Sequence, residues 1–263
     1  MLSKNRIKFI KSLESKKVRA ETGLFLAEGN KLVADLLPFF DCELLLAKSS
    51  WMATQGDLKA KEIIVAEEND IEKASLLKNP QDVLAVFVQP TRKLDKIVLA
   101  NELALVLDGI QDPGNLGTIV RLADWFGIST VICSPDTADI YNPKTVQATM
   151  GGLARVSVFY ESLPELLDGC TGGRMGVSDT PLSPTPMPIY GTFLDGNTIY
   201  NEKLTSTGLI IMGNEGNGIR PETAQHVTNR LYIPNFPLGT PTTESLNVAT
   251  ATAITLSEFR RRM

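Results

Sequence analysis

Two stretches decide the predicted fold: Leu209–Glu222, LIIMGNEGNGIRPE, and Leu231–Ala251, LYIPNFPLGTPTTESLNVATA. Each begins with a short apolar run, Leu209–Met212 or Leu231–Ile233, that stops at Gly or Pro. Such runs are typical of buried parallel strands. Open α/β proteins bind their ligands in the loops that follow the carboxyl ends of parallel strands. We therefore expect the functional site in the loops that follow these two strands.

The composition, 43% hydrophobic and 21% charged, is that of a globular protein. The 263 residues are enough for two domains of ordinary size. No apolar run is long enough to cross a bilayer, and the basic start of the chain lacks the apolar segment of a secretory signal. Cys42, Cys133 and Cys170 are far apart and His226 is the only histidine, which argues against a metal centre or a Cys–His catalytic pair. The sequence predicts a cytoplasmic protein with no metal and no membrane segment.

Strand-like and helix-like patterns alternate along the chain, which predicts an α/β fold. A linker at Gln89–Lys93 divides it into domains 1–92 and 93–263. In the first domain, a small α/β sandwich, strands are expected at Leu24–Ala27, Cys42–Ala47, Ile63–Val65 and Leu84–Val88, and helices at Ile7–Leu13, from Gly29 to Leu37, near Ser50 and at Ile71–Leu77.

The second domain is expected to hold a mostly parallel sheet with helices on both faces. Besides the two opening runs, strands are expected at Leu103–Leu107, Thr130–Cys133, Arg155–Phe159 and, more weakly, Met175–Val177; helices are expected at Asn115–Phe126, Lys144–Met150, Ser162–Leu167 and Ser245–Arg261. Pro181–Pro188 is expected to be an irregular loop.

Several familiar sites are excluded by spacing. The loops DPGNLG at 112–117 and GNEGNG at 213–218 both lack the G-x-G-x-x-G spacing of a dinucleotide fingerprint, and the chain has no Walker-type phosphate loop. A serine nucleophile needs a nearby base, and nothing in the sequence places His226 beside Ser245. What remains is a site built from Asn, Arg, Glu, Ser and backbone groups.

Three blocks carry a family resemblance. They are Asn115–Arg121, NLGTIVR, with Ala123 and Gly127; Met212–Gly218, MGNEGNG; and Ile233-Pro234 followed by Glu244–Val248, ESLNV. In this order they resemble the motifs of the SpoU/TrmH family of RNA 2′-O-ribose methyltransferases, the alpha/beta-knot or SPOUT class. The first domain, including Phe25–Gly29, more loosely resembles the L30e-like substrate-binding domain that precedes the knot in many members.

The resemblance implies a C-terminal trefoil-knot methyltransferase domain that holds S-adenosylmethionine between its two last loops. Gly213, Ile233 and Leu246 match the family positions that line this pocket. Gly213, Gly216 and Gly218 also permit positive φ and close backbone approach, although the same glycines would suit simple turns. The spacer 235–243 is longer than in most members, and the segment 186–204 is extended; both are expected near the cofactor.

The resemblance also implies roles for five polar side chains. Family members are proposed to use the arginine matching Arg121 to activate the ribose 2′-hydroxyl. Because a guanidinium is a poor base, we interpret Arg121 as binding the 2′-oxygen and the adjacent phosphate. Asn115 would fix the loop or the arginine, and Glu215 would orient Arg121 or a substrate group. Ser245 and Asn247 would hydrogen-bond across the site; capping of a helix is a further role for Asn115 and Ser245.

The start of the chain is basic although the whole chain is acidic. Met1–Lys31 has eight Lys and Arg residues against three Glu, a net charge of +5, while the chain has −4. This asymmetry suits an end that meets phosphate, although a solvated helix face would look the same. The candidate RNA-binding residues are Lys8, Lys11, Lys16, Lys17 and Arg19.

The last helix has apolar residues on two faces, with Leu246, Ala249, Ala253 and Leu256 on one and Val248, Ala251 and Ile254 on the other. A helix that is apolar on most sides needs two covering surfaces, and the second is expected to be another subunit of a homodimer.

We therefore expect a dimeric, S-adenosylmethionine-dependent RNA ribose 2′-O-methyltransferase. Ribosomal RNA is the expected substrate, with transfer RNA as the alternative. A catalytically silent knotted RNA-binding protein is the rival hypothesis, and methylation of a base or a small molecule is a third. Failure to bind the cofactor would favour the silent protein.

Overall fold

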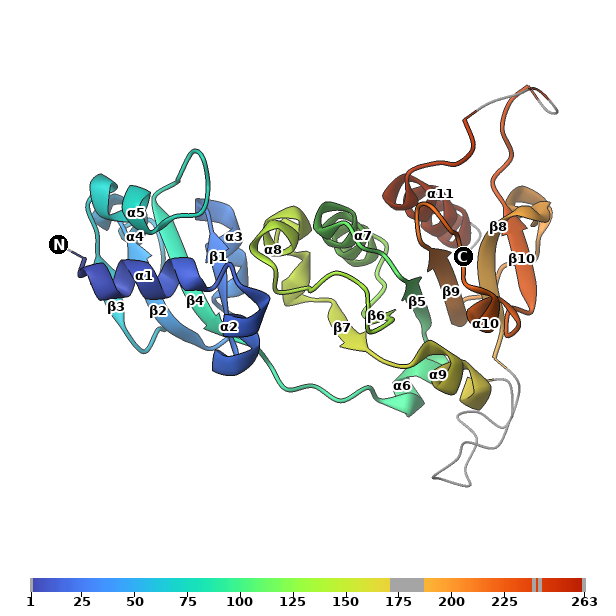
Figure 1. Ribbon diagram of the computed structural model, residues 1–263, viewed down its shortest axis with the longest axis horizontal. Helices are drawn as coiled ribbons and strands as arrows, with labels where there is room; N and C mark the ends of the chain where they lie inside the picture. The colour runs from blue at the N-terminus through green and yellow to red at the C-terminus, as the bar shows by residue number, and fades with distance from the viewer. Residues whose placement is uncertain (1, 171–186, 238–239, 241–242, 262–263) are drawn as a thin grey trace. The chain divides into compact units, whose positions relative to one another are not determined.

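The computed structural model describes residues 2–170, 187–237, 240 and 243–261 (Figure 1). The chain forms two compact units. The first unit is Met1–Thr91 with Asp139–Ala154, and the second unit is Arg92–Ala138 with Arg155–Met263. Among the described residues, no helix combines the length and apolar character needed to cross a membrane.

The first unit is built on a four-stranded sheet in the order β1-β4-β2-β3. Strand β4 is antiparallel to β1 and β2, and β2 is parallel to β3. The strands are β1 Leu24–Glu28, β2 Cys42–Ala47, β3 Ile63–Val65 and β4 Val83–Val88; the helices are α1 Lys4–Ser12, α2 Lys16–Thr22, α3 Asn30–Leu36, α4 Ser49–Met52, α5 Glu68–Ala74 and α8 Pro143–Thr149, with the 3₁₀ helix η1 Gly152–Ala154.

Alternate residues of this sheet are buried on opposite faces, as the period of a strand requires. Leu26, Leu44 and Leu84 pack with Ile10 and Leu13 next to α1. The other face holds an aromatic cluster of Phe25, Phe40, Phe87 and Tyr141. Both faces are therefore covered, and the predicted α/β layering of this part is confirmed. Helix α2 was not predicted.

The segment Asp139–Ala154 belongs to the range 93–263 in the sequence-based division, yet its contacts place it in the first unit. Helix α8 packs on β1, and the Tyr141 ring lies 4.9 Å from the ring of Phe25. These contacts join residues more than a hundred positions apart, which a division made at a linker does not reveal.

The second unit has a six-stranded sheet in the order β10-β8-β9-β5-β6-β7, and each of its described pairs is parallel. The predicted α/β class with a mostly parallel sheet is confirmed. The strands are β5 Leu103–Asp108, β6 Thr130–Cys133, β7 Ser157–Tyr160, β8 Ile189–Thr198, β9 Gly208–Gly213 and β10 Asn229–Tyr232. The helices are α6 Lys96–Asn101, α7 Pro113–Trp125, α9 Leu163–Cys170, α10 Pro221–Ala224 and α11 Val248–Arg261, with the 3₁₀ helix η2 Ile199–Asn201.

Strand β8 is the main element that the sequence analysis missed. Its register against β10 jumps, so that Arg230 pairs with Gly191 but Leu231 pairs with Asn197. Residues 192–196 therefore bulge out of the ladder, and the strand lacks the regular alternation by which strands are predicted. The strand expected at Met175–Val177 and most of the loop Pro181–Pro188 lie outside the described residues.

Candidate active site

Three of the five predicted catalytic side chains meet at the carboxyl edge of the parallel sheet. The Nδ2 atom of Asn115 donates to Oε1 of Glu215 at 2.7 Å, and Nδ2 of Asn247 donates to Oδ1 of Asn115 at 3.0 Å. Asn115 is on α7, Glu215 is in the loop after β9, and Asn247 immediately precedes α11. The two hydrogen bonds join three segments that the sequence keeps apart.

The predicted capping role of Asn115 is wrong. Helix α7 begins at Pro113, and its N-cap is Asp112, whose Oδ1 accepts from the backbone N–H of Asn115 at 2.8 Å. Proline suits the first helical position because its missing N–H would have no partner there. With Asp112 as the cap, the carboxamide of Asn115 is available for contacts outside its own helix.

Ser245, the other residue expected to cap a helix, is not the N-cap of α11. Helix α11 begins at Val248, and Oδ1 of Asn247 accepts from the N–H groups of Ala249 and Thr250 at 3.0 and 3.3 Å. Ser245 is exposed and precedes this cap. Asn247 therefore caps the helix with its oxygen and contacts Asn115 with its nitrogen.

The loop Gly213–Gly218 is closed at its base. The backbones of Asn214 and Gly218 exchange two hydrogen bonds of 3.0 and 2.9 Å. A Cβ at Gly213 would come within 2.3 Å of the Gly218 carbonyl carbon, and Gly218 itself has φ of 69°. Both positions thus require glycine, and the tight closure projects Glu215 from the tip of the loop.

A cavity of about 520 Å³ opens beside this loop. All three residues predicted to bind the cofactor, Gly213, Ile233 and Leu246, line it, as do Glu215 and Ser245. The lining also contains apolar residues from β8 and α11 that the sequence analysis did not assign to the pocket: Phe193, Leu194, Val248 and Ala251. Only the extended segment 186–204 had indicated that this region would lie near the site.

The β8 bulge is held to β10 by one arginine. The guanidinium carbon of Arg230 lies 3.5 Å from the centre of the Phe193 ring, and Nη2 of Arg230 forms an ion pair with Asp195. Gly196 lies so close to β10 that a Cβ would be 2.7 Å from the carbonyl carbon of Leu231. These contacts fix Phe193 in the wall of the cavity.

Arg121, the remaining predicted catalytic residue, stands apart from this group. It is exposed on α7, and the described residues offer it no hydrogen bond or ion pair. It is six positions from Asn115, about 9 Å along the axis and about 120° around the helix. Arg121 and Asn115 therefore lie on different sides of α7.

Helices α7 and α11 lie side by side and run in the same direction. The Asn247–Asn115 bond joins their starts, and Arg260 donates to the carbonyl oxygens of Phe126 and Gly127, at 2.7 and 2.9 Å, where they end. Trp125 is 83% exposed at the end of α7. Ala253 and Ile254 of α11 are only partly buried. The helix pair thus leaves apolar surface in contact with water.

Comparison with known sequences identifies the family. The sequence model described as the SpoU rRNA Methylase family matches residues 102–257. This chain belongs to the SpoU family. A second model, the MRM3-like substrate binding domain, matches residues 4–85 of this SpoU family member. The resemblance stated from the motifs is confirmed.

Several relatives match this chain over nearly its whole length. The 23S rRNA (guanosine(2553)-2′-O)-methyltransferase RlmP of Bacillus subtilis is 31% identical, over 97% of this chain and 96% of RlmP. A structure from Porphyromonas gingivalis, assigned to the TrmH family of RNA methyltransferases, is 40% identical with a TM-score of 0.86 and full coverage of both chains. The SpoU methyltransferase AviRb from Streptomyces viridochromogenes, in complex with the cofactor AdoMet, is 25% identical with a TM-score of 0.82, over 99% of this chain and 98% of AviRb.

The predicted RNA-binding residues divide into two groups in the first unit of this SpoU protein. Lys8, Lys11, Lys16 and Lys17 are exposed on or next to helices α1 and α2. Arg19 is only 1% exposed, and its guanidinium pairs with Asp139 at 2.6 Å. It also donates to two backbone carbonyl oxygens. The prediction for Arg19 is therefore corrected: its side chain holds α2 to the segment Asp139–Ala154 and is not available to phosphate.

Proposed function

We propose that this protein transfers a methyl group from S-adenosylmethionine to a ribose 2′-hydroxyl of ribosomal RNA. The observation that carries the proposal is the hydrogen-bonded group Asn247–Asn115–Glu215, which borders the cavity through Glu215. Membership of the SpoU rRNA Methylase family supports the reaction, and the 23S rRNA named for RlmP supports the substrate.

The cavity fits the chemistry of the cofactor. Its volume of about 520 Å³ lies within the range of about 300–1,000 Å³ usual for small-molecule sites. Its apolar walls suit an adenine ring, and among the described residues that line it the charged ones are Glu215 and Glu244. An acidic lining favours a ligand with a sulfonium and an ammonium group over a phosphate. Gly213, Ile233 and Leu246 are the residues proposed to hold it.

When bound, S-adenosylmethionine supplies an electrophilic methyl group to the attacking ribose oxygen. The protein must then orient the 2′-hydroxyl and stabilise the negative charge that develops on its oxygen. We assign the charge stabilisation to Arg121, whose guanidinium also suits the neighbouring phosphate. Asn115 and Asn247 hold Glu215 at the cavity edge, and exposed Ser245 provides a hydroxyl to the substrate side.

Arg121 reaches this site most simply from a second subunit. Within one chain it lies on a different side of α7 from Asn115, while apolar surface lies exposed at Trp125 and on α11. Burying an exposed Trp favours association. We propose a homodimer in which the α7–α11 surface forms the interface and Arg121 of each chain serves the cavity of the other.

The remaining assignments follow from the same family relationship. Residues 1–92 are proposed to be the RNA-reading domain, with Lys8, Lys11, Lys16 and Lys17 on phosphates, and 93–263 the methyltransferase domain. The loop after β10 is proposed to complete a trefoil knot around the cofactor. A cytoplasmic location suits an enzyme that modifies ribosomal RNA.

The test is a map of ribose methylation. Total RNA from cells with and without the protein is cleaved by alkali, which spares bonds next to a methylated ribose. We expect one protected position in ribosomal RNA from cells that contain the protein. This protection should be lost in cells that lack the protein and in cells that carry the Glu215→Gln variant. A protected position in transfer RNA would redirect the substrate. No change in any RNA, together with no binding of S-adenosylhomocysteine by calorimetry, would leave the silent RNA-binding protein as the better hypothesis.

A further inference from the structure

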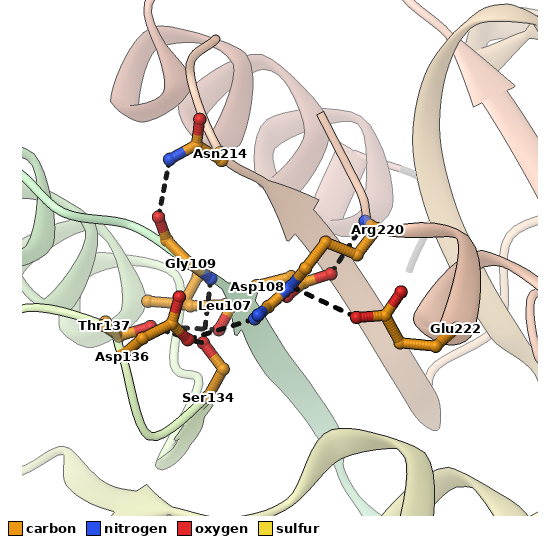
Figure 2. A network of polar contacts seen from close by, with 9 residues as sticks. All are labelled: Leu107, Asp108, Gly109, Ser134, Asp136, Thr137, Asn214, Arg220 and Glu222. Carbon is orange, nitrogen blue, oxygen red and sulfur yellow. Dashed lines mark hydrogen bonds and ion pairs between the residues drawn. The ribbon is translucent and has the colours of Figure 1, made fainter. Parts of the chain in front are cut away.

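A buried carboxylate lies at the end of β5, one of the two central strands of the second unit. Asp108, the last residue of β5, is 0% exposed. Its two oxygens accept from the backbone N–H of Arg220 at 2.9 Å and from Nε of Arg220 at 2.6 Å, and Nη2 of Arg220 completes the ion pair. Figure 2 shows the guanidinium of Arg220 beside Asp108, with Asp136 and Glu222 within ion-pair distance.

The neighbouring residue holds the other side of the same loop. The carbonyl oxygen of Gly109 accepts from Nδ2 of Asn214 at 2.7 Å (Figure 2). The Oδ1 atom of Asn214 accepts from the N–H groups of Gly216 and Asn217, at 2.9 and 3.2 Å, within the loop. Asn214 precedes Glu215, and Arg220 follows the loop. Asp108, at the end of β5, and Gly109, which follows it, thus bind the residues on the two sides of the loop that carries Glu215.

The geometry points to Arg220 as a positioning residue that acts through Asp108 to hold Glu215 against Asn115; this inference rests on the proposed function. Residues 108–115 run from the end of β5 into α7, so the same short segment presents Asp108 at one end and Asn115 at the other. The Asp108–Arg220 contact anchors the loop that carries Glu215 to the same segment. It thereby keeps Glu215 within hydrogen-bond distance of Asn115, at 2.7 Å.

The electrostatics of Arg220 favour this anchor. The hydrogen bond to Asp108 raises the pKa of Arg220 above its usual value, and a hydrogen bond from Ser134 Oγ, with a further one from Arg220, lowers the pKa of Asp136. A buried carboxylate is costly unless a charged partner satisfies it. Asp108 therefore keeps Arg220, and with it the loop, in one place.

A double-mutant cycle tests the inference. Arg220→Gln, purified as folded protein, is expected to lower the methyl-transfer rate at saturating RNA and cofactor by about 10- to 100-fold, because small displacements of positioned groups are costly. The RNA concentration for half-maximal rate should stay at the parent value. Combined with Glu215→Gln, it should lower the rate no further than Glu215→Gln alone. If the rate of the double variant falls by the product of the two single-variant reductions, the inference is overturned. A parent-like rate for Arg220→Gln would also overturn it.

Glu222→Gln is the matched control. It removes an exposed partner of Arg220, 3.9 Å from Nε, but leaves the contacts with Asp108 intact. Its rate should equal that of the parent. A second readout needs no RNA: because the loop backbone lines the cavity, Arg220→Gln should weaken S-adenosylhomocysteine binding several-fold by calorimetry. If the parent methylates no RNA but this fall in affinity is seen, the proposed function fails while the anchoring role stands.

The pair variant covers the case in which Arg220→Gln does not fold. Asp108→Asn with Arg220→Gln removes both charges together, and Arg220→Lys keeps the charge with fewer donors. Either is expected to fold and to transfer methyl groups more slowly than the parent. If none of the three variants folds, the ion pair is a requirement for folding and the positioning inference is overturned. If the neutral pair works at the full rate, the ion pair has no part in positioning Glu215.

Discussion

A carboxamide has a donor at one end and an acceptor at the other, and Asn115 uses both. Its nitrogen holds Glu215, and its oxygen accepts from Asn247. Alanine offers neither group, and aspartate would place a second carboxylate next to Glu215. The chemistry of this position therefore requires an amide, which a purely capping role would not.

Arg121→Ala is expected to abolish methyl transfer and to leave cofactor affinity nearly unchanged. The reason is that Arg121 is exposed and does not line the cavity. Methyl transfer is followed with tritiated cofactor, and affinity is measured by calorimetry with S-adenosylhomocysteine. A large drop in affinity in this variant would contradict the assignment of Arg121 to the RNA side of the reaction.

Glu28 gives the first unit a dependence on pH. It is buried, and burial raises its pKa above the usual value of a glutamate although Ser75 Oγ and the N–H of Leu76 donate to it. The folded state thus binds the proton more tightly than the unfolded state. The free energy of unfolding should therefore fall as the pH rises from the unfolded to the folded pKa.

Glu28→Gln should remove this slope. Relative to the parent, the variant gains stability as the pH rises through that window, and the difference is constant above it. Urea denaturation of both proteins between about pH 4 and pH 8 measures the difference. A difference that does not vary with pH would show that the carboxyl group has no raised pKa.

At the scale of elements, one helix pair and one bulge shape the second unit. Helices α7 and α11 are joined at both ends by polar contacts and leave Trp125 uncovered. The bulge of β8 places Phe193 in the cavity wall, where Arg230 and Gly196 fix it. Both features depend on which segments lie next to each other, and not on local propensity.

Ala253→Asp is expected to convert the proposed dimer to monomers. Ala253 is half-buried on α11, and a charge in an apolar interface costs about 3–5 kcal/mol when it has no partner. Light scattering at several concentrations gives the mass. The control is Ala20→Asp on an exposed position of α2, which should leave the mass unchanged. A dimeric Ala253→Asp protein would place the subunit contact elsewhere.

At the scale of the whole molecule, the first unit is not the first ninety residues alone. Thr145 and Val146 of α8 are fully buried within that unit, and Arg19 pairs with Asp139. Deleting residues 1–91 would uncover this surface. Point substitutions on the exposed lysines are therefore the better test of RNA recognition.

Changing Lys8, Lys16 and Lys17 together to Ala is expected to weaken RNA binding. It should also flatten the plot of log affinity against log salt concentration by about 2 to 3 units, because each phosphate that a lysine no longer neutralises lowers the slope by about 0.7–0.9. Fluorescence anisotropy of a labelled RNA measures both the affinity and its salt dependence. Cofactor affinity should not change, because the cavity is formed by the second unit.

The control for this prediction is a second triple variant. Lys59, Lys73 and Lys78 belong to the same unit but lie outside α1 and α2. Changing them to Ala alters the net charge equally. If both triple variants flatten the salt dependence to the same extent, the binding is a general charge effect and α1–α2 is not the RNA-reading surface.

Much of the fold could be predicted because its signals are local. Cys42–Ala47, Ile63–Val65 and Thr130–Cys133 are strands with the predicted bounds. Continuous apolar runs that end at Gly, Pro or polar residues mark strands. Cys42–Ala47 and Thr130–Cys133 are largely buried, whereas Ile63–Val65 is an edge strand with Ile63 and Val65 exposed. The three motifs likewise revealed the family from short blocks, and the predicted cofactor-binding residues Gly213, Ile233 and Leu246 all line one cavity.

Tertiary structure decided which of the motif residues touch. Asn115 meets Glu215 and Asn247 across 100 and 132 positions of chain, while Arg121 on the same helix meets neither. Tertiary structure also decided the ion pairs of buried Arg19 with Asp139 and of Arg220 with Asp108. By itself, the sequence determined most of the strands, the motifs and the family, since these follow from residue order. Contacts between distant loops depend on strand pairing and helix direction, and only the folded chain specifies them.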